Sequence, residues 1–201
     1  MANIKASESG IFGKILYTEE QIRERAKELA KQISTDFEGE ELIVIGTLKG
    51  SVLWMCDLLK ELTIDTSIDF IKASSYGSST TSSGVVKIKM DTDMNLYQKN
   101  VLIIEDIVDT GTTLTFLLEK LKERNPKTIK VCTMLDKPSR RTTGFVADYI
   151  GFTVDDLFII GYGLDFDQKY RGLPYISYLQ PGEIYRKVTT PSHNKLVINS
   201  T

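Results

Sequence analysis

Residues 101–114, with the sequence VLIIEDIVDTGTTL, constrain the fold of this chain most strongly. The first four residues are all apolar, which is typical of a strand buried on both faces in a parallel sheet. Two acids, Glu105 and Asp106, follow at once, and the small, hydroxyl-rich residues 109–113 then lead into leucines at helical spacing. The stretch therefore predicts a strand that ends at the acids, a loop and the start of a helix, as in an α/β fold.

The loop in this stretch has the chemistry of an anion site. In an open α/β sheet, ligands bind beyond the carboxyl ends of the strands, where the free N–H groups of a helix favour phosphate. Glu105 and Asp106 would repel a bare phosphate, so the pattern favours a phosphosugar whose hydroxyls and divalent metal engage both carboxylates. The residues alone leave one alternative open, in which Asp109 or Thr110 is only a helix N-cap and the acids are only solvated.

A second unit of strand, turn and helix precedes this one. Residues 42–46 are apolar, the turn after them contains Lys49 and Gly50, and residues 52–62 have one apolar helical face. Right-handed crossovers between parallel strands would place Lys49 and Gly50 beside the loop that contains Asp109. A solvated turn lysine is the ordinary alternative for Lys49.

Periodicity predicts the other elements of a single domain. Thr18 is expected to cap a helix whose apolar residues lie between positions 22 and 33. The domain is expected to span residues 1–186, followed by a polar, loosely ordered tail at residues 187–201. Further strands are expected at residues 68–73, 85–90, 128–135, 145–150 and 157–160.

Composition and charge exclude several classes of protein. The 201 residues, of which 41% are hydrophobic, can bury one full core. A net charge of −2 argues against binding nucleic acid through a basic surface. The sequence contains no apolar run of about 18 residues and no apolar leader, so we expect no membrane span and a cytoplasmic location. Cys56 and Cys132 lie in apolar segments and are both expected to be buried, reduced thiols.

Two common nucleotide-binding motifs are not present. Gly161 and Gly163 begin a glycine-rich pattern, but Phe166 occupies the third glycine position. Lys49 is not preceded by the glycines that a P-loop requires. A dinucleotide site of that type, a kinase and a GTPase are therefore not expected.

The stretch around Glu105 resembles the motif with which type I phosphoribosyltransferases bind phosphoribosyl pyrophosphate (PRPP): an apolar run, two acids, two apolar positions and D-[ST]-G-x-T. The resemblance extends over roughly residues 15–185 and is strongest to the bacterial-type hypoxanthine-guanine phosphoribosyltransferases. It implies a central, mostly parallel sheet flanked by helices. It also implies a small hood lobe built from N- and C-terminal segments, and a flexible β-hairpin lid at about residues 74–85.

The resemblance implies a purine-salvage enzyme, a glycosyltransferase that moves a pentosyl group. With Mg²⁺ as cofactor, it would transfer the 5-phosphoribosyl group from PRPP to hypoxanthine or guanine, giving IMP or GMP and pyrophosphate. A homo-oligomer, either dimer or tetramer, is expected. Two alternatives stay open: a regulatory protein of the same fold that binds PRPP or nucleotide, and a phosphoribosyltransferase that prefers xanthine.

The resemblance also assigns residues to PRPP and metal. Lys49, Gly50 and Arg171 would hold pyrophosphate, and the turn at Leu48 matches a family pattern that often contains a cis peptide. Glu105 and Asp106 would engage the ribose hydroxyls directly or through magnesium, and Asp165 would bind a second magnesium. The residues implied to contact the 5′-phosphate are Asp109, Thr110, Gly111, Thr112 and Thr113, and those in the lid over PRPP are Ser75 and Tyr76.

The purine base is expected to contact three further residues. Phe158 would stack on the ring, the backbone of Ile159 would read its edge, and Lys137 would donate to the 6-oxo group. A 6-amino group offers that lysine no acceptor, so adenine should be a poor substrate. In the competing interpretation Phe158 is core and Lys137 is a surface lysine, which would make Arg140 or Arg141 the next candidates.

Asp109 is the predicted general base. A carboxylate does not help to bind phosphate in a loop that otherwise contains neutral hydroxyls and glycine, so it should have another task. Accepting the proton that N7 of the purine loses is such a task.

Overall fold

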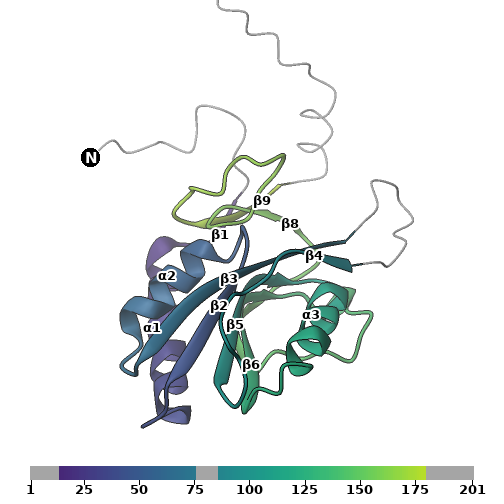
Figure 1. The fold of residues 1–201 in the computed structure, drawn as a ribbon. Coiled ribbons are helices and arrows are strands. Elements are labelled where there is room, and N and C mark those ends of the chain that lie inside the picture. Colours follow the sequence, from purple (N-terminus) through teal and green to yellow (C-terminus); the bar gives the residue numbers. More distant parts are fainter. Residues whose placement is uncertain (1–13, 76–85, 180–201) are drawn as a thin grey trace, which may run out of the picture.

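The computed structural model describes residues 14–75 and 86–179, and a six-stranded sheet forms its centre (Figure 1). The strand order is β4-β3-β2-β5-β6-β7, and every neighbouring pair is parallel except β3 and β4. This confirms the predicted α/β architecture. The strands are β2 (Leu42–Thr47), β3 (Thr66–Ser75), β4 (Val86–Met90), β5 (Asn100–Val108), β6 (Thr128–Asp136) and β7 (Tyr149–Thr153).

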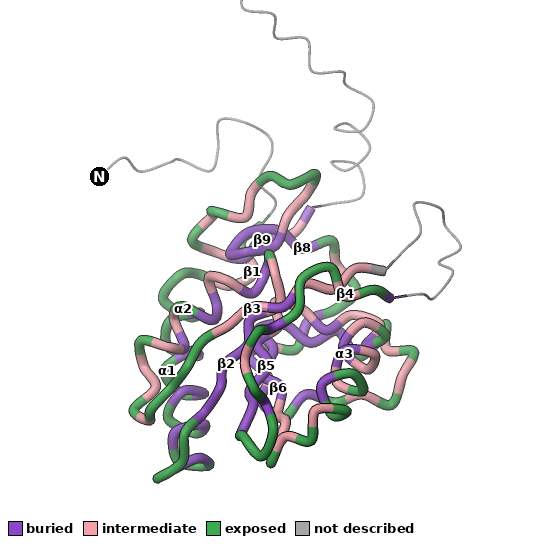
Figure 2. The backbone as a smooth tube through the Cα atoms, in the orientation of Figure 1, coloured by how far each residue is buried: buried purple, intermediate pink, exposed green. Residues whose placement is uncertain are grey.

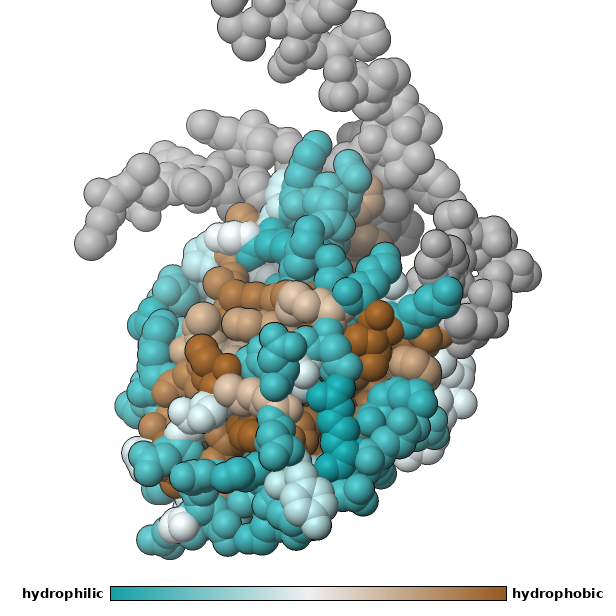
Figure 3. All heavy atoms as spheres, in the orientation of Figure 1, coloured by the Kyte–Doolittle hydropathy of each residue, from teal (hydrophilic) through white to brown (hydrophobic). Residues whose placement is uncertain are grey.

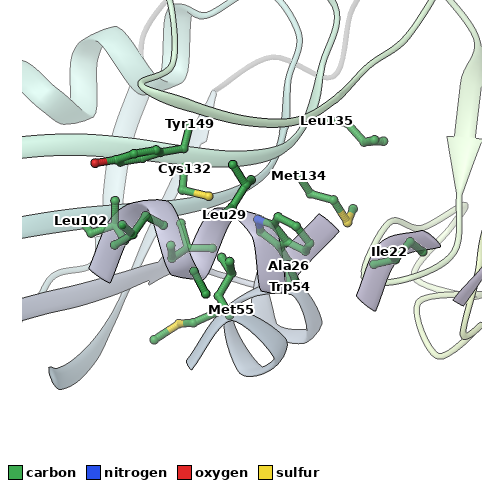
Figure 4. Close-up of a cluster of buried hydrophobic side chains, with 14 of the residues drawn as sticks. Ile22, Ala26, Leu29, Trp54, Met55, Leu102, Cys132, Met134, Leu135 and Tyr149 are labelled. Carbon is green, nitrogen blue, oxygen red and sulfur yellow. The ribbon is translucent and has the colours of Figure 1, made fainter. Parts of the chain in front are cut away.

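Helices cover both faces of this sheet. α1 (Glu19–Asp36) and α2 (Val52–Glu61) pack on one face, and α3 (Thr112–Lys122) packs on the other (Figure 1). Side chains of β5 alternate between the two layers, so Leu102 joins the cluster around Trp54 that Figure 4 shows, while Ile103 joins the cluster beneath α3. Because β5 is buried on both faces, its backbone runs through the most buried part of the tube in Figure 2.

The start of α1 follows the sequence prediction. The Thr18 hydroxyl accepts a hydrogen bond from the Gln21 N–H at 3.3 Å, and the Gln21 side chain accepts one from the Thr18 N–H at 2.9 Å. This reciprocal capping box satisfies two backbone donors. The helix then buries its apolar residues from Ile22 to Ile33 against the sheet.

A separate three-stranded sheet forms a hood above the carboxyl ends of the central strands (Figure 1). Its order is β1-β9-β8, so it joins segments from the two ends of the described chain, as predicted. The rings of Tyr17 and Phe152 stack with their centroids 4.0 Å apart and connect this hood to β7. The hood strands are β1 (Ile15–Tyr17), β8 (Phe158–Ile160) and β9 (Ile176–Leu179).

Three sequence predictions were wrong in detail. β5 does not end at Glu105 but continues to Val108, because its backbone remains paired with β6. The strand expected from residue 145 begins only at Tyr149, where pairing with β6 starts. Cys56 is exposed on α2, because the cysteine lies on the helix surface away from the sheet, whereas Cys132 is buried as expected.

Several predicted features lie outside the described residues. They are Tyr76 with most of the lid, and the tail at residues 187–201. Ser75 ends β3 and pairs with Val86 at the start of β4. In the described part of the chain, no helix combines the length and the apolar character needed to cross a bilayer.

Candidate active site

The loop between β5 and α3 lies at the carboxyl end of the sheet. Gly111, with φ of 83°, occupies the N-cap position of α3, so neither Asp109 nor Thr110 is the cap. The Thr110 carbonyl accepts hydrogen bonds from the Thr142 N–H at 3.0 Å and the Thr143 hydroxyl at 3.4 Å. These two contacts fix the loop from the side of residues 142–143, and the Thr112 N–H donates to the Thr110 hydroxyl at 3.4 Å. The start of α3 at this loop is the kind of helix N-terminus that can bind an anion.

Two neighbouring carboxyl groups, those of Glu105 and Asp106, lie in the last residues of β5, before the strand ends at Val108. Removal from solvent, together with the carboxylate of Asp106, raises the pKa of Glu105 well above its usual value. Gly50 packs directly on the other carboxyl, because a Cβ added to Gly50 would lie 1.4 Å from Oδ2 of Asp106. The turn after β2 thus lies beside Asp106 of β5, three residues before Asp109, whose loop the sequence analysis expected this turn to adjoin. Two adjacent acids of this kind fit ribose hydroxyls or a divalent cation.

The raised pKa of Glu105 predicts that Glu105→Gln stabilises the unliganded protein at neutral pH. The folded state holds a proton on Glu105 more tightly than the unfolded state does. The contribution of Glu105 to stability is therefore fully present below the pKa that Glu105 has in the unfolded chain. It is lost as pH rises through the pKa that Glu105 has in the folded protein. The variant removes this loss, so its Tm should exceed that of the wild type at pH 7, with about 2–4 °C for each kcal/mol gained.

Thermal unfolding at pH 4 and at pH 7 checks this prediction. The difference in Tm between variant and wild type should shrink at pH 4, because Glu105 is then largely protonated in the folded and in the unfolded protein. An equal difference at both pH values would show that titration of Glu105 is not its cause.

The turn after β2 also meets the segment that follows β8. The peptide bond between Leu48 and Lys49 is cis. Nζ of Lys49 donates to the side-chain oxygen of Gln168 at 3.0 Å. Arg171 forms an ion pair with Asp165 at 2.6 Å. The structure thus brings Lys49, Asp165 and Arg171 to one side of the site, together with Gln168, which the sequence analysis did not identify.

A pocket of about 590 Å³ lies between the central sheet and the hood. Lys137 is only 7% exposed there, and its Nζ donates to the Leu157 carbonyl at 2.5 Å, so it is not a surface lysine. Phe158 is 41% exposed, and its ring forms a T-shaped contact with the Phe166 ring, with the centroids 5.5 Å apart, so it is not a core residue. Lys137, Phe158 and Ile159 therefore line one cavity, as the predicted purine site requires.

Asp109 lies where two pockets meet. It lines the 590 Å³ pocket and also a smaller one of about 170 Å³ formed by the loop at the start of α3. Its carboxylate forms an ion pair with Nε of Arg140 at 2.9 Å, and Arg140 also contacts Asp156 at 3.3 Å. The sequence left Arg140 only as a substitute for Lys137, because no spacing pattern indicates which acid an arginine will contact.

Arg141 has a different environment from Arg140. It pairs with Asp136, and both side chains are only 12% exposed. Its Nη1 also donates to the Phe145 carbonyl at 3.2 Å, which secures the segment behind the Thr110 loop. Arg141 is therefore a support for that loop and does not line the 590 Å³ pocket.

The predicted magnesium ligands do not form a closed protein site. In residues 14–75 and 86–179 no group of three or more Asp, Glu, His or Cys side chains is placed to hold a metal. Glu105 and Asp106 adjoin each other, whereas Asp165 is already paired with Arg171. Magnesium usually retains waters and substrate oxygens and needs only one or two carboxylates, so this donor set fits an ion that arrives with a phosphate substrate.

A larger pocket, of about 920 Å³, lies at the opposite, amino-terminal end of the sheet. Its lining includes two lysines and seven acids, and the acids include Glu24, Glu61 and Asp65. This surface would repel a polyanionic substrate, so the size of the pocket does not make it the site for phosphate chemistry.

Comparisons with known proteins agree with this geometry. The family described as "Phosphoribosyl transferase domain" matches residues 13–167. A hypoxanthine-guanine phosphoribosyltransferase from Bacillus subtilis is 45% identical over 168 residues, which cover 84% of this chain and 93% of the relative. The crystal structure of a hypoxanthine-guanine phosphoribosyltransferase from Bacillus anthracis matches with a TM-score of 0.81 and 48% identity, covering 84% of this chain and 99% of that one.

A longer relative shares the same region. The bifunctional protein TilS/HprT from Listeria monocytogenes is 45% identical over 172 residues. The match covers 86% of this chain but only 26% of the Listeria protein.

Proposed function

The chain belongs to the phosphoribosyl transferase domain family, and from this premise we propose that it is a purine-salvage enzyme. It transfers the 5-phosphoribosyl group of PRPP to hypoxanthine or guanine and releases pyrophosphate, so that IMP or GMP is formed. The observation that carries the proposal is the position of Asp109 between the loop pocket at α3 and the pocket lined by Lys137 and Phe158. A phosphosugar in the first and a purine in the second would meet at this carboxylate.

The PRPP side of the proposed site consists of three parts. The N–H groups and hydroxyls of residues 110–113 bind the 5′-phosphate. Lys49 and Arg171 offset the negative charge that grows on pyrophosphate as it leaves. Glu105 and Asp106 bind the ribose hydroxyls and favour the positive charge that develops on the ring in the transition state.

Mg²⁺ is the proposed cofactor. Glu105, Asp106 and Asp165 would hold it together with oxygens of the substrate, and when bound it neutralises phosphate charge. The ion pair of Asp165 with Arg171, at 2.6 Å, would place this third carboxylate beside the pyrophosphate side.

On the purine side, Phe158 stacks on the ring and the backbone of Ile159 reads its edge. Nζ of Lys137 donates to the 6-oxo group, for which it exchanges its present acceptor, the Leu157 carbonyl. Asp109 accepts the proton from N7 as the new bond to the anomeric carbon forms.

We also propose that the protein is a cytoplasmic homo-oligomer. The support for an oligomer is an apolar surface on the face of the sheet beside α2, where Figure 3 shows brown, hydrophobic side chains gathered. Ile68 on β3 is 51% exposed and Met90 on β4 is 41% exposed. Burial of such side chains favours association, and light scattering after size exclusion would measure the number of subunits.

A spectrophotometric assay with PRPP, Mg²⁺ and each of hypoxanthine, guanine, xanthine and adenine tests the proposed activity. Hypoxanthine and guanine should be converted, and adenine should not. Conversion of xanthine alone would support the narrower alternative. Absence of conversion with all four bases would contradict the proposed function.

A further inference from the structure

Tyr162 has an unusual backbone for a residue with a large side chain. It lies between Gly161 and Gly163 directly after β8, and its φ of 46° falls in the left-handed region. This conformation is unfavourable for residues with a Cβ, so tertiary contacts must hold it. Tyr162 is only 5% exposed, and its N–H donates to the Leu173 carbonyl at 2.9 Å.

The hydroxyl of Tyr162 reaches across to α2. It donates to Oδ2 of Asp57 and lies 3.5 Å from the Leu53 carbonyl, while Oδ1 of Asp57 accepts from Lys60 at 2.8 Å. Burial and the carboxylate of Asp57 raise the pKa of Tyr162, so the hydroxyl remains a donor at neutral pH. The loop after β8 is thus tied to the helix that begins directly after the Lys49 turn.

This tie has a consequence at the next residue, Gly163. A Cβ added to Gly163 would lie 1.9 Å from the Gly50 carbonyl oxygen, so the two backbones are in direct contact. Gly50 in turn packs on the Asp106 carboxyl. The carbonyl of Gly163 accepts from Nη1 of Arg171 at 2.6 Å. The position of Gly163 therefore determines how Arg171 lies relative to Gly50 and Asp106.

We propose that the hydrogen bond between Tyr162 and Asp57 positions the pyrophosphate side of the site by holding Gly163 against Gly50. This inference rests on the proposed function. Neither side chain lines the two pockets that meet at Asp109, so Tyr162 and Asp57 are positioning residues.

Tyr162→Phe tests the proposal, because it removes the hydroxyl and keeps the ring. The KM for PRPP, and the KM for pyrophosphate in the reverse reaction, should rise about tenfold, which corresponds to about 1.4 kcal/mol. The kcat and the KM for hypoxanthine should change less than about threefold, because the purine pocket and Asp109 are untouched. Hydrogen exchange at the amides of residues 161–163 should become faster, because the loop is released.

Tyr149→Phe is the matched control. The hydroxyl of Tyr149 also donates to a carboxylate, Asp36, at 2.7 Å, and Tyr149 is only 2% exposed. It joins β7 to α1, away from the Lys49 turn. Loss of this hydroxyl should affect stability and leave the KM for PRPP unchanged.

Asp57→Ala provides a second route if Tyr162→Phe does not fold. It should raise the KM for PRPP by a similar factor, and the double variant should add little, since both changes remove one interaction. Asp57→Asn keeps an acceptor oxygen for Tyr162 and should restore much of the affinity for PRPP.

Two results would overturn the proposal. One is a Tyr162→Phe protein with reduced Tm and an unchanged KM for PRPP, since this would show a purely structural hydrogen bond. The other is unchanged exchange at residues 161–163. If the wild type itself transfers no phosphoribosyl group, the proposed function fails, and the exchange measurement with calorimetric titration of magnesium and PRPP still decides whether the hydrogen bond positions the loop.

Discussion

Asp109→Asn is expected to lower kcat by about 10²–10⁴-fold, the range usual for loss of a general base. Asparagine matches the shape of aspartate, so the loop before α3 should be retained. An amide cannot accept the N7 proton, and the loss should therefore appear in kcat with little change in the KM for PRPP. Steady-state kinetics with hypoxanthine at saturating PRPP would measure it.

The ion pair with Arg140 calls for a matched control. Arg140 contacts Asp109 at 2.9 Å and Asp156 at 3.3 Å, so Asp156→Asn perturbs the same arginine without removing the proposed base. Its kcat should stay within about fivefold of the wild type. An Asp109→Asn rate within about threefold of wild type would remove Asp109 from the mechanism.

Lys137→Gln is expected to lower kcat/KM for hypoxanthine and guanine by about 10–100-fold, because a hydrogen bond to a charged group contributes roughly 1.5–3 kcal/mol. Lys137 is buried, and the Leu157 carbonyl accepts from Nζ at 2.5 Å, so its ammonium is already directed within the pocket. Glutamine has no charge and presents either a donor or an acceptor. Discrimination against adenine should therefore weaken.

Kinetics with hypoxanthine, guanine and adenine would measure this effect, with Lys130→Gln as the control. Lys130 lies on β6, the strand that ends directly before Lys137, but its Nζ is 3.8 Å from Asp36 and 5.3 Å from the Tyr149 ring centroid, away from the pocket. Unchanged kcat/KM for both 6-oxopurines, without gain for adenine, would refute the role of Lys137. Arg140 would then be the next candidate, since it lines the pocket and Arg141 does not.

Local sequence determined much of the fold because apolar periodicity and helix capping depend on residues within one strand or within one or two turns of a helix. Apolar runs placed β2, β5 and β6, and the Thr18 capping box defined the start of α1. The acids and hydroxyls at residues 105–113 indicated the site, since parallel strands carry their functional loops at one edge. The family resemblance added the hood and three residues that line the 590 Å³ pocket, Lys137, Phe158 and Ile159.

Contacts between distant segments were decided only by the tertiary structure. Pairing with β6 extended β5 through Glu105, and packing of α2 left Cys56 exposed. The partners Arg140 and Asp109, and likewise Tyr162 and Asp57, are separated by long stretches of chain. Local periodicity indicates which face of an element is buried, but it does not indicate which side chain of another element lies opposite, because that depends on how the layers pack.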